Sequence, residues 1–181
     1  EQRDWLLADG ATGTNLFQAG LQSGDSPELW NDLFPDRIIN LYQSAVDSGS
    51  DIFLTNTFGC NAARLKLHGA ERRVFELNKI SAELGREVAD KSSKAIVVAG
   101  SVGPTGENFH PIGDLRHESA VEIFHEQAEG LKEGGADVLW LETISAEEEF
   151  VAAAEAFERA SMPWCGTCLL YTSPSPRDLR L

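Results

Sequence analysis

Polar side chains that could bind a ligand follow four short apolar runs of this 181-residue sequence. Each run passes directly into acids, hydroxyl residues, amides or glycines, at residues 6–14, 51–59, 95–106 and 138–143. A short buried strand that leads into a functional loop has this pattern. In a parallel barrel the carboxyl ends of the strands meet at one rim, where such enzymes carry their chemistry. The candidate site residues at these ends are Asp9, Gly10, Ala11, Asn56, Ser101 and Glu142.

Other kinds of site have weaker support. Residues 103–106 superficially suggest a phosphate loop, but no Gly-Lys-Ser or Gly-Lys-Thr follows them. His117 and His125 stand eight residues apart, whereas metal ligands on one helix stand four apart. We expect all four histidines to be surface or packing residues. We expect Cys60 and Cys165 to be small core residues rather than zinc ligands.

The elements that must position the site follow from the spacing of apolar residues. Strands are expected at residues 5–8, 51–55, 95–99, 137–141 and 162–167. Helices are expected from Pro35 to Gly49 and at residues 61–67, 73–90, 117–133 and 145–160. Residues 15–33 are expected to form a long loop with at most one helical turn. Residues 145–148 match a capping box, and the acids at 147–149 suggest a solvated first helical turn.

Strands and helices alternate in this prediction, without a hairpin signal. Right-handed crossovers between parallel strands follow from that order. A complete (β/α)8 barrel needs about 250 residues, and the elements predicted in this chain make up about half of one. The predicted fold class is therefore α/β, a TIM barrel truncated to about its first four to five βα units. An open doubly wound sheet is the alternative.

The end of the chain differs from the rest. Residues 1–167 are predicted to be the N-terminal half of a barrel domain, whereas residues 168–181 show neither a helical nor a strand period. The run from Cys168 to Asp178 resembles the translation of a transposase-type sequencing adapter read in frame. We interpret residues 168–181 as an adapter-derived tail, with a natural disordered tail as the alternative.

Composition excludes several classes of partner. The formal net charge of −14 would repel a phosphate backbone, so no nucleic-acid partner is expected. No apolar run approaches the roughly 20 residues that span a bilayer, so no membrane partner is expected. Three sparse cysteines do not form a disulfide framework, and no signal peptide is visible. These features indicate a reducing, cytoplasmic location.

Several separated motifs together resemble the homocysteine S-methyltransferase family. They lie at residues 9–14, 54–59, 64–68, 99–106 and 134–143, and the resemblance covers residues 5–167. The family includes betaine–homocysteine methyltransferases and the first module of cobalamin-dependent methionine synthase. The resemblance implies a (β/α)8 barrel that methylates the thiol of homocysteine to give methionine. The methyl donor it implies is betaine, a methylated corrinoid or another donor.

The resemblance also implies roles for particular residues. Asp9 and Glu142 match the acids that bind the substrate ammonium, and the Gly10 and Ala11 amides would receive its carboxylate. Asn56 and Ser101 lie on the rim loops and could contact the substrate, with plain loop hydrogen bonds as the alternative. The structural alternative for Asp9 is an Asx turn, and that for Glu142 is an acid that faces solvent. The family holds zinc with three cysteines, from the end of the sixth strand and a Cys-Cys pair near the eighth. Those positions lie beyond Thr167, so this chain should lack them.

A position of the methyl-donor pocket also departs from the family pattern. Animal betaine enzymes place a cage tyrosine after the Thr-Phe of the second strand, and Gly59 stands there in this chain. A pocket of the animal betaine type is therefore not expected.

Three interpretations of function stay open. The first is a zinc-dependent homocysteine methyltransferase of which this chain is the N-terminal half, inactive alone. The second is another parallel-barrel enzyme, either pterin-binding or aldolase-like, with other roles for Asp9 and Glu142. The third is a non-catalytic fragment whose exposed strand edge makes it aggregate or pair with another half. Oligomerisation is left open in all three.

Overall fold

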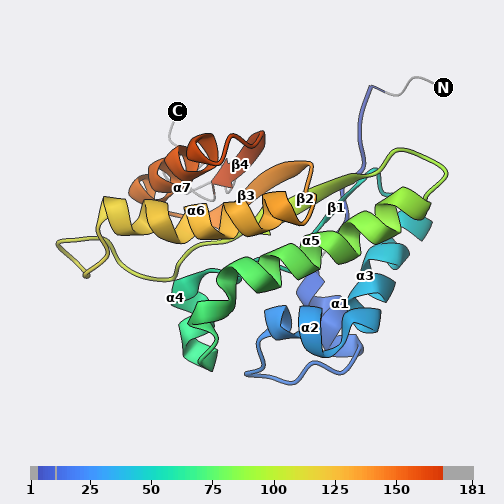
Figure 1. Cartoon of the computed structure of the whole chain (residues 1–181), viewed down its shortest axis with the longest axis horizontal. Coiled ribbons are helices and arrows are strands. Elements are labelled where there is room, and N and C mark those ends of the chain that lie inside the picture. The colour runs from blue at the N-terminus through green and yellow to red at the C-terminus, as the bar shows by residue number, and fades with distance from the viewer. Residues whose placement is uncertain (1–3, 11, 169–181) are drawn as a thin grey trace, which may run out of the picture.

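A parallel sheet of four strands forms the centre of the molecule (Figure 1). The computed structural model describes residues 4–10 and 12–168, so Ala11 and most of the predicted tail lie outside the described residues. The strands are β1 (Ile52–Leu54), β2 (Val97–Val102), β3 (Val138–Ile144) and β4 (Trp164–Cys168). They pair in sequence order, β1-β2-β3-β4, with every pair parallel. This order is that of consecutive βα units, which confirms the predicted α/β barrel class.

The strands β2 and β3 extend further toward their carboxyl ends than the apolar runs suggested. Ser101 lies in β2 and Glu142 lies in β3, although the predicted strands ended at Ala99 and Leu141. The pairing of Ser101 with Trp140 and of Val102 with Leu141 continues the ladder through these positions. The polar residues therefore lie on the strands themselves, whose backbone is fixed by the sheet.

The segment expected as the first strand makes only one bridge in the described residues. Ala8 pairs in parallel with Ile52, the Ile52 amide donates to the Leu7 carbonyl at 3.0 Å, and the Asp9 amide donates to the Ile52 carbonyl at 2.9 Å. Trp5, Leu6 and Leu7 are exposed. Because β1 is the only neighbouring strand described, the segment has half of the pairing that a barrel strand requires.

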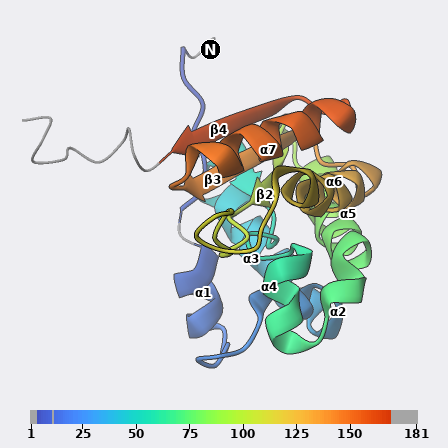
Figure 2. The same ribbon diagram turned by 90° about the vertical axis from the view of Figure 1, so that its left-hand side faces the viewer.

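Helices follow the strands in the expected places, and four are long. These are α3 (Pro35–Asp47), α5 (Val74–Lys91), α6 (His117–Glu133) and α7 (Glu147–Arg159). They pack side by side in that order and cover one face of the sheet (Figure 1). The predicted loop at residues 15–33 is wrong in part, because α1 (Thr12–Gln18), a 3₁₀ turn (Pro27–Leu29) and α2 (Trp30–Leu33) occupy it. Together with α4 (Ala62–Leu65), these short helices lie on the side away from β4 (Figure 2).

Close packing between the sheet and its helices depends on small residues. A Cβ atom at Gly100 of β2 would lie 2.8 Å from Leu131 Cδ1 of α6. The absence of a side chain there lets α6 lie directly on the strand that carries Ser101. Val98, Leu139, Phe124 and Leu131 are fully buried in this layer, which therefore has the close packing of a protein core.

The start of α7 corrects two predictions. The helix begins at Glu147 after an Ala146 cap that makes no side-chain hydrogen bond, so the capping box from Ser145 to Glu148 is wrong. Glu149 is not solvated but only 5% exposed. Its Oε1 accepts hydrogen bonds from the Thr105 amide at 2.8 Å and the Thr105 hydroxyl at 2.7 Å. These bonds turn the first helical turn toward the loop after β2 and compensate for burial of the acid.

Cys165 is exposed, which corrects its assignment to the core. It lies on β4, which pairs only with β3 among the described residues. The prediction assumed a strand enclosed by neighbours on both sides. Cys60 is fully buried, as expected, and burial raises the pKa of its thiol.

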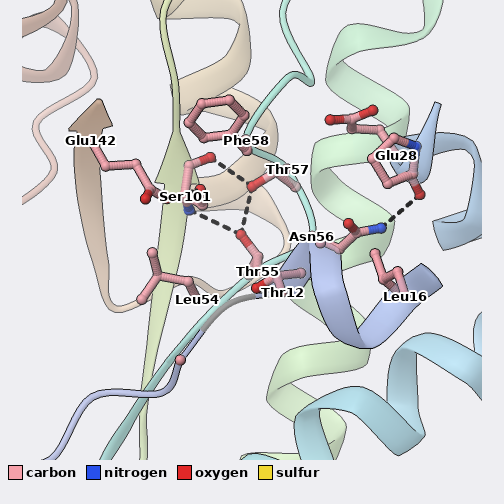
Figure 3. A pocket seen from close by; sticks show the side chains of 13 residues that line it. Thr12, Leu16, Glu28, Leu54, Thr55, Asn56, Thr57, Phe58, Ser101 and Glu142 are labelled. Atoms are coloured by element: carbon pink, nitrogen blue, oxygen red, sulfur yellow. Dashed lines mark hydrogen bonds between the residues drawn. The ribbon is translucent and has the colours of Figure 1, made fainter. Parts of the chain in front are cut away.

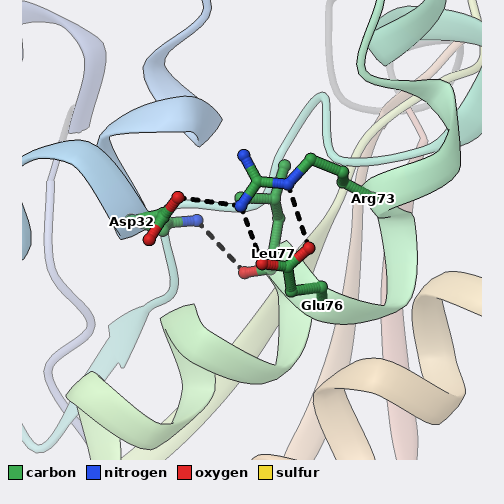
Figure 4. A network of polar contacts seen from close by, with 5 residues as sticks. Asp32, Arg73, Glu76 and Leu77 are labelled. Atoms are coloured by element: carbon green, nitrogen blue, oxygen red, sulfur yellow. Dashed lines mark hydrogen bonds and ion pairs between the residues drawn. The ribbon is translucent and has the colours of Figure 1, made fainter.

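An ionic cluster fixes α2 to the start of α5 (Figure 4). The Arg73 guanidinium lies 2.8 Å from Asp32 Oδ2 and 2.7 Å from Glu76 Oε1, and it lowers the pKa of Glu76. Beside it, Asn31 Nδ2 donates to the Leu77 carbonyl at 3.3 Å. These contacts hold the segment of residues 15–33 against the start of α5.

Within residues 4–10 and 12–168, no helix is long and apolar enough to cross a membrane.

Candidate functional site

A pocket of about 270 Å³ opens at the carboxyl ends of the strands (Figure 3). Gly10 follows the first segment, Thr12 and Gly13 begin α1, and Ser101 and Glu142 come from the ends of β2 and β3. The remaining lining comes from Leu16, Pro27, Glu28 and residues 54–58. All four polar ends recognised in the sequence therefore meet around one cavity, and they contribute the predicted residues Gly10, Asn56, Ser101 and Glu142.

Glu142 is held by a hydroxyl from the adjacent strand. Ser101 Oγ donates to Glu142 Oε1 at 2.5 Å, and Glu142 is only partly buried. A carboxylate oriented by a short hydrogen bond still has acceptor sites for a ligand. The arrangement therefore presents a fixed negative charge to the pocket.

Asp9 lies beside the pocket rather than in its lining. It lines an adjoining cavity of about 140 Å³ that shares Gly10 and Thr12 with the first. Its Oδ2 accepts a hydrogen bond from the Leu54 amide at 3.1 Å. The pKa of Asp9 is raised to about 6, chiefly by burial and in addition by the charge of Glu142, against the opposing effect of the Leu54 amide. Two acids that repel each other in this way favour a bound cation.

Asn56 has little left to offer a ligand. Its Nδ2 donates to the Pro27 carbonyl at 2.7 Å and to Asn31 Oδ1 at 2.9 Å, which uses both amide hydrogens. Its backbone amide donates to the Tyr42 hydroxyl at 2.7 Å. The side-chain oxygen remains as an acceptor, so Asn56 is suited to a ligand that donates hydrogen bonds.

Ala11, the other predicted amide donor, lies outside the described residues.

Sequence reasoning missed Glu28, which lines the pocket although it is only 6% exposed. Its Oε1 accepts from the Gly59 amide at 2.8 Å and its Oε2 from the Ser26 hydroxyl at 2.6 Å. A Cβ atom at Gly59 would lie 2.7 Å from Oε1, so the carboxylate occupies the space beside this glycine. The only feature of the sequence that could have pointed to Glu28 is its position directly before the apolar pair Leu29 and Trp30.

Comparison with known proteins identifies the family. The sequence profile of homocysteine S-methyltransferases matches residues 6–180. The chain belongs to the homocysteine S-methyltransferase family. Methionine synthase of Mycobacterium tuberculosis is 30% identical over 164 residues, which span 86% of this chain and 14% of that protein. Methionine synthase of Mycobacterium leprae is 29% identical over the same shares.

Solved structures of the homocysteine methyltransferase MmuM from Escherichia coli are similar as well. The metallated form superposes with a TM-score of 0.78 at 25% identity, over 90% of this chain and 62% of that one. The apo form gives a TM-score of 0.69 at 25% identity, over 92% and 60%. The chain thus spans about three fifths of the MmuM chain, which agrees with the predicted truncated barrel.

The metal of the family does not fit the residues described in this chain. Residues 4–10 and 12–168 contain no cluster of three His, Cys, Asp or Glu side chains that would hold an ion. Cys60 is enclosed in an apolar cluster with Leu65, Val74 and Leu77, where a raised thiol pKa disfavours the thiolate that binds zinc. The described residues therefore place polar groups around the pocket without forming a cluster that would hold the metal.

Proposed function

We propose that the protein to which this chain belongs transfers a methyl group to the thiol of homocysteine, giving methionine. The observation that carries the proposal is the proximity of two acids at the strand ends, Glu142 in the pocket and Asp9 in the adjoining cavity, whose charges interact. Hydrogen-bond donors hold both acids, and among the described residues neither forms an ion pair with a basic side chain. A cationic ligand group would relieve their mutual repulsion.

The substrate fits this arrangement through its amino-acid end. The ammonium of homocysteine would lie between Asp9 and Glu142, with the Asn56 side-chain oxygen as a further acceptor. Its carboxylate would bind backbone amides of the turn at residues 10 and 11, as anions do in glycine-rich turns. Ser101 would keep Glu142 directed at the ammonium, since its hydroxyl already donates to that carboxylate. The thiol would then point away from these residues, toward the reacting centre.

The residues that bind zinc would lie in another part of the family barrel. Since the described residues do not form a metal site, we propose that the three cysteine ligands lie beyond Thr167 in the intact protein. This chain alone would then be inactive. Betaine, a methylated corrinoid or another donor would supply the methyl group, although Glu28 beside Gly59 does not support a tyrosine cage. A cytoplasmic location is part of the proposal and is supported by the free Cys60 and Cys165.

Sequencing of the source DNA through the codon for Thr167 is the first test. We expect the reading frame to continue into a sixth strand that ends in cysteine, and to encode a Cys-Cys pair later. The interpretation of residues 168–181 as an adapter-derived tail is tested by the same read. A natural frame that stops at Leu181 would overturn catalysis for this polypeptide.

Activity of the full-length protein is the second test. Zinc-loaded enzyme should form methionine from homocysteine with betaine or with methylcobalamin, and Glu142→Gln should raise the homocysteine KM at least tenfold, because a charged partner of the ammonium is lost. Zinc content serves as the control and should be unchanged in the variant. Methionine formation that is unaffected by Glu142→Gln would contradict the assigned role.

A further inference from the structure

Gln127 of α6 donates hydrogen bonds to two residues that line the pocket. The side chain is fully buried, and its Nε2 donates to the Thr57 carbonyl at 2.7 Å and to the Ser101 carbonyl at 3.4 Å. Thr57 follows β1 and Ser101 lies on β2, so a single amide group joins two strand ends. Sequence analysis did not single out Gln127, because it lies in the middle of a regular helix.

The Ser101 backbone is held from both sides. Its amide donates to Thr55 Oγ1 at 3.1 Å, and its carbonyl accepts from Thr57 Oγ1 at 2.7 Å as well as from Gln127 (Figure 3). The two threonine hydroxyls are themselves 2.6 Å apart. This closed set of hydrogen bonds fixes the direction in which the Ser101 hydroxyl points, and that hydroxyl donates to Glu142 at 2.5 Å.

We propose that Gln127 is a positioning residue for the substrate ammonium. It fixes the backbone at Thr57 and Ser101, and thereby sets the hydroxyl that orients Glu142. This inference rests on the proposed function, since it concerns the acid assigned to the homocysteine ammonium. Gln127 does not touch the pocket itself.

A purely structural role is the competing explanation. A buried glutamine that satisfies two carbonyl groups would stabilise many folds. The Oε1 atom of Gln127, however, is buried without a hydrogen-bond partner among the described residues. An unpaired buried acceptor destabilises the folded state. Since Asn78 of α5 leaves its side-chain oxygen unpaired as well, this atom does not distinguish the two roles. The distinguishing feature of Gln127 is that its two donated bonds are directed at residues that line the pocket.

Asn78 of α5 provides a matched control. It is also fully buried, donates through Nδ2 to two carbonyl groups, those of Cys60 and Val74, each at 2.7 Å, and leaves its Oδ1 unpaired. Neither carbonyl belongs to a residue that lines the pocket. The two amides thus match in burial and hydrogen bonding and differ in what they hold.

The experiment compares Gln127→Met and Asn78→Leu in the zinc-loaded full-length protein. Gln127→Met should raise the homocysteine Kd and KM about tenfold with kcat at saturation retained, because the ammonium contact is misaligned and the reacting centre is not. Asn78→Leu should change the melting temperature but leave both constants within twofold. Equal effects of the two variants on Kd would overturn the proposal.

A double-mutant cycle with Ser101→Ala separates positioning from stability. If Gln127 acts through the Ser101 hydroxyl, Gln127→Met should weaken binding less than twofold once that hydroxyl is removed, since coupled residues are not additive. A full tenfold effect in the Ser101→Ala background would overturn the proposed route. Should Gln127→Met not fold, Gln127→Asn, which keeps the amide and shortens its reach, gives the same comparison. If the wild-type protein binds no homocysteine, the proposed function fails, whereas normal binding by Gln127→Met overturns the positioning role alone.

Discussion

Replacement of Asp9 by Asn should stabilise the protein and at the same time weaken substrate binding. Burial and the nearby Glu142 charge raise the pKa of Asp9 from 3.8 to about 6, so its ionised form is unfavourable in the folded state. At about 1.36 kcal/mol per pKa unit, the upper bound of this penalty is roughly 3 kcal/mol at neutral pH. Because Asp9 is only partly buried, solvent screening reduces the expected value to about 1 kcal/mol. Asn retains an oxygen for the Leu54 amide, so that bond need not be lost.

The expected result is a melting temperature about 2–4 °C higher for Asp9→Asn at pH 7.5 in a domain of this size. The penalty is absent well below pH 3.8, where Asp9 is protonated in both states, grows as the pH rises from 3.8, and is complete above about 6. The difference between variant and wild type should therefore shrink when the melts are repeated at pH 5. Homocysteine binding, measured by calorimetry on the full-length protein, should weaken at least tenfold, because the ammonium loses a charged partner.

Asp51 is the matched control at the same junction. Its carboxylate accepts a hydrogen bond from the Leu7 amide at 3.0 Å and lies 3.0 Å from the Lys94 ammonium. Asp51→Asn removes an attractive partner and should lower the melting temperature. An Asp9→Asn variant that melts below wild type at pH 7.5, as Asp51→Asn should, would refute the argument that Asp9 is strained by burial and by Glu142.

Three further predictions concern the same region. The homocysteine affinity of the wild-type protein should fall as the pH drops through about 6, because Asp9 becomes protonated, and calorimetry from pH 5 to 8 tests this. Gly103→Ala should lower stability by about 1–3 kcal/mol in denaturant melts, since its Cβ would lie 2.5 Å from the Phe58 ring. Gly59→Ala should likewise destabilise and should also weaken homocysteine binding, because the new Cβ displaces the Glu28 carboxylate that lines the pocket.

The parts of the fold that were predictable are those with a repeating pattern. The apolar spacing of α5 and α6 placed these helices within one residue of their observed bounds, because each packs one face on its neighbours. The order of the strands followed from the alternation of elements. The excursion at residues 15–33 has no period, and its helices depend on contacts such as that of Asp32 with Arg73.

The residues of the candidate site likewise divide into those that the sequence pattern could predict and those that it could not. Asp9, Ser101 and Glu142 were recognisable because they interrupt apolar runs. Glu28, Gln127 and the buried state of Glu149 were not, because each is defined by hydrogen bonds to residues more than 25 positions away. Cys165 was misplaced for a related reason, since its exposure depends on what lies beside β4 rather than on its own strand.

The hydrogen bonds around Ser101 also bear on how the protein folds. They join residues 41 to 46 positions apart in the chain, and the bond from Gln127 to Thr57 spans 70 positions. Non-local contacts of this kind form slowly, because each closes a long loop before any energy is gained. The pocket is therefore complete only after β1, β2, β3 and α6 have docked together. A ligand that binds there would stabilise only the completely folded state. Homocysteine binding, used as the signal in a refolding experiment, would therefore report the last steps of folding rather than the first.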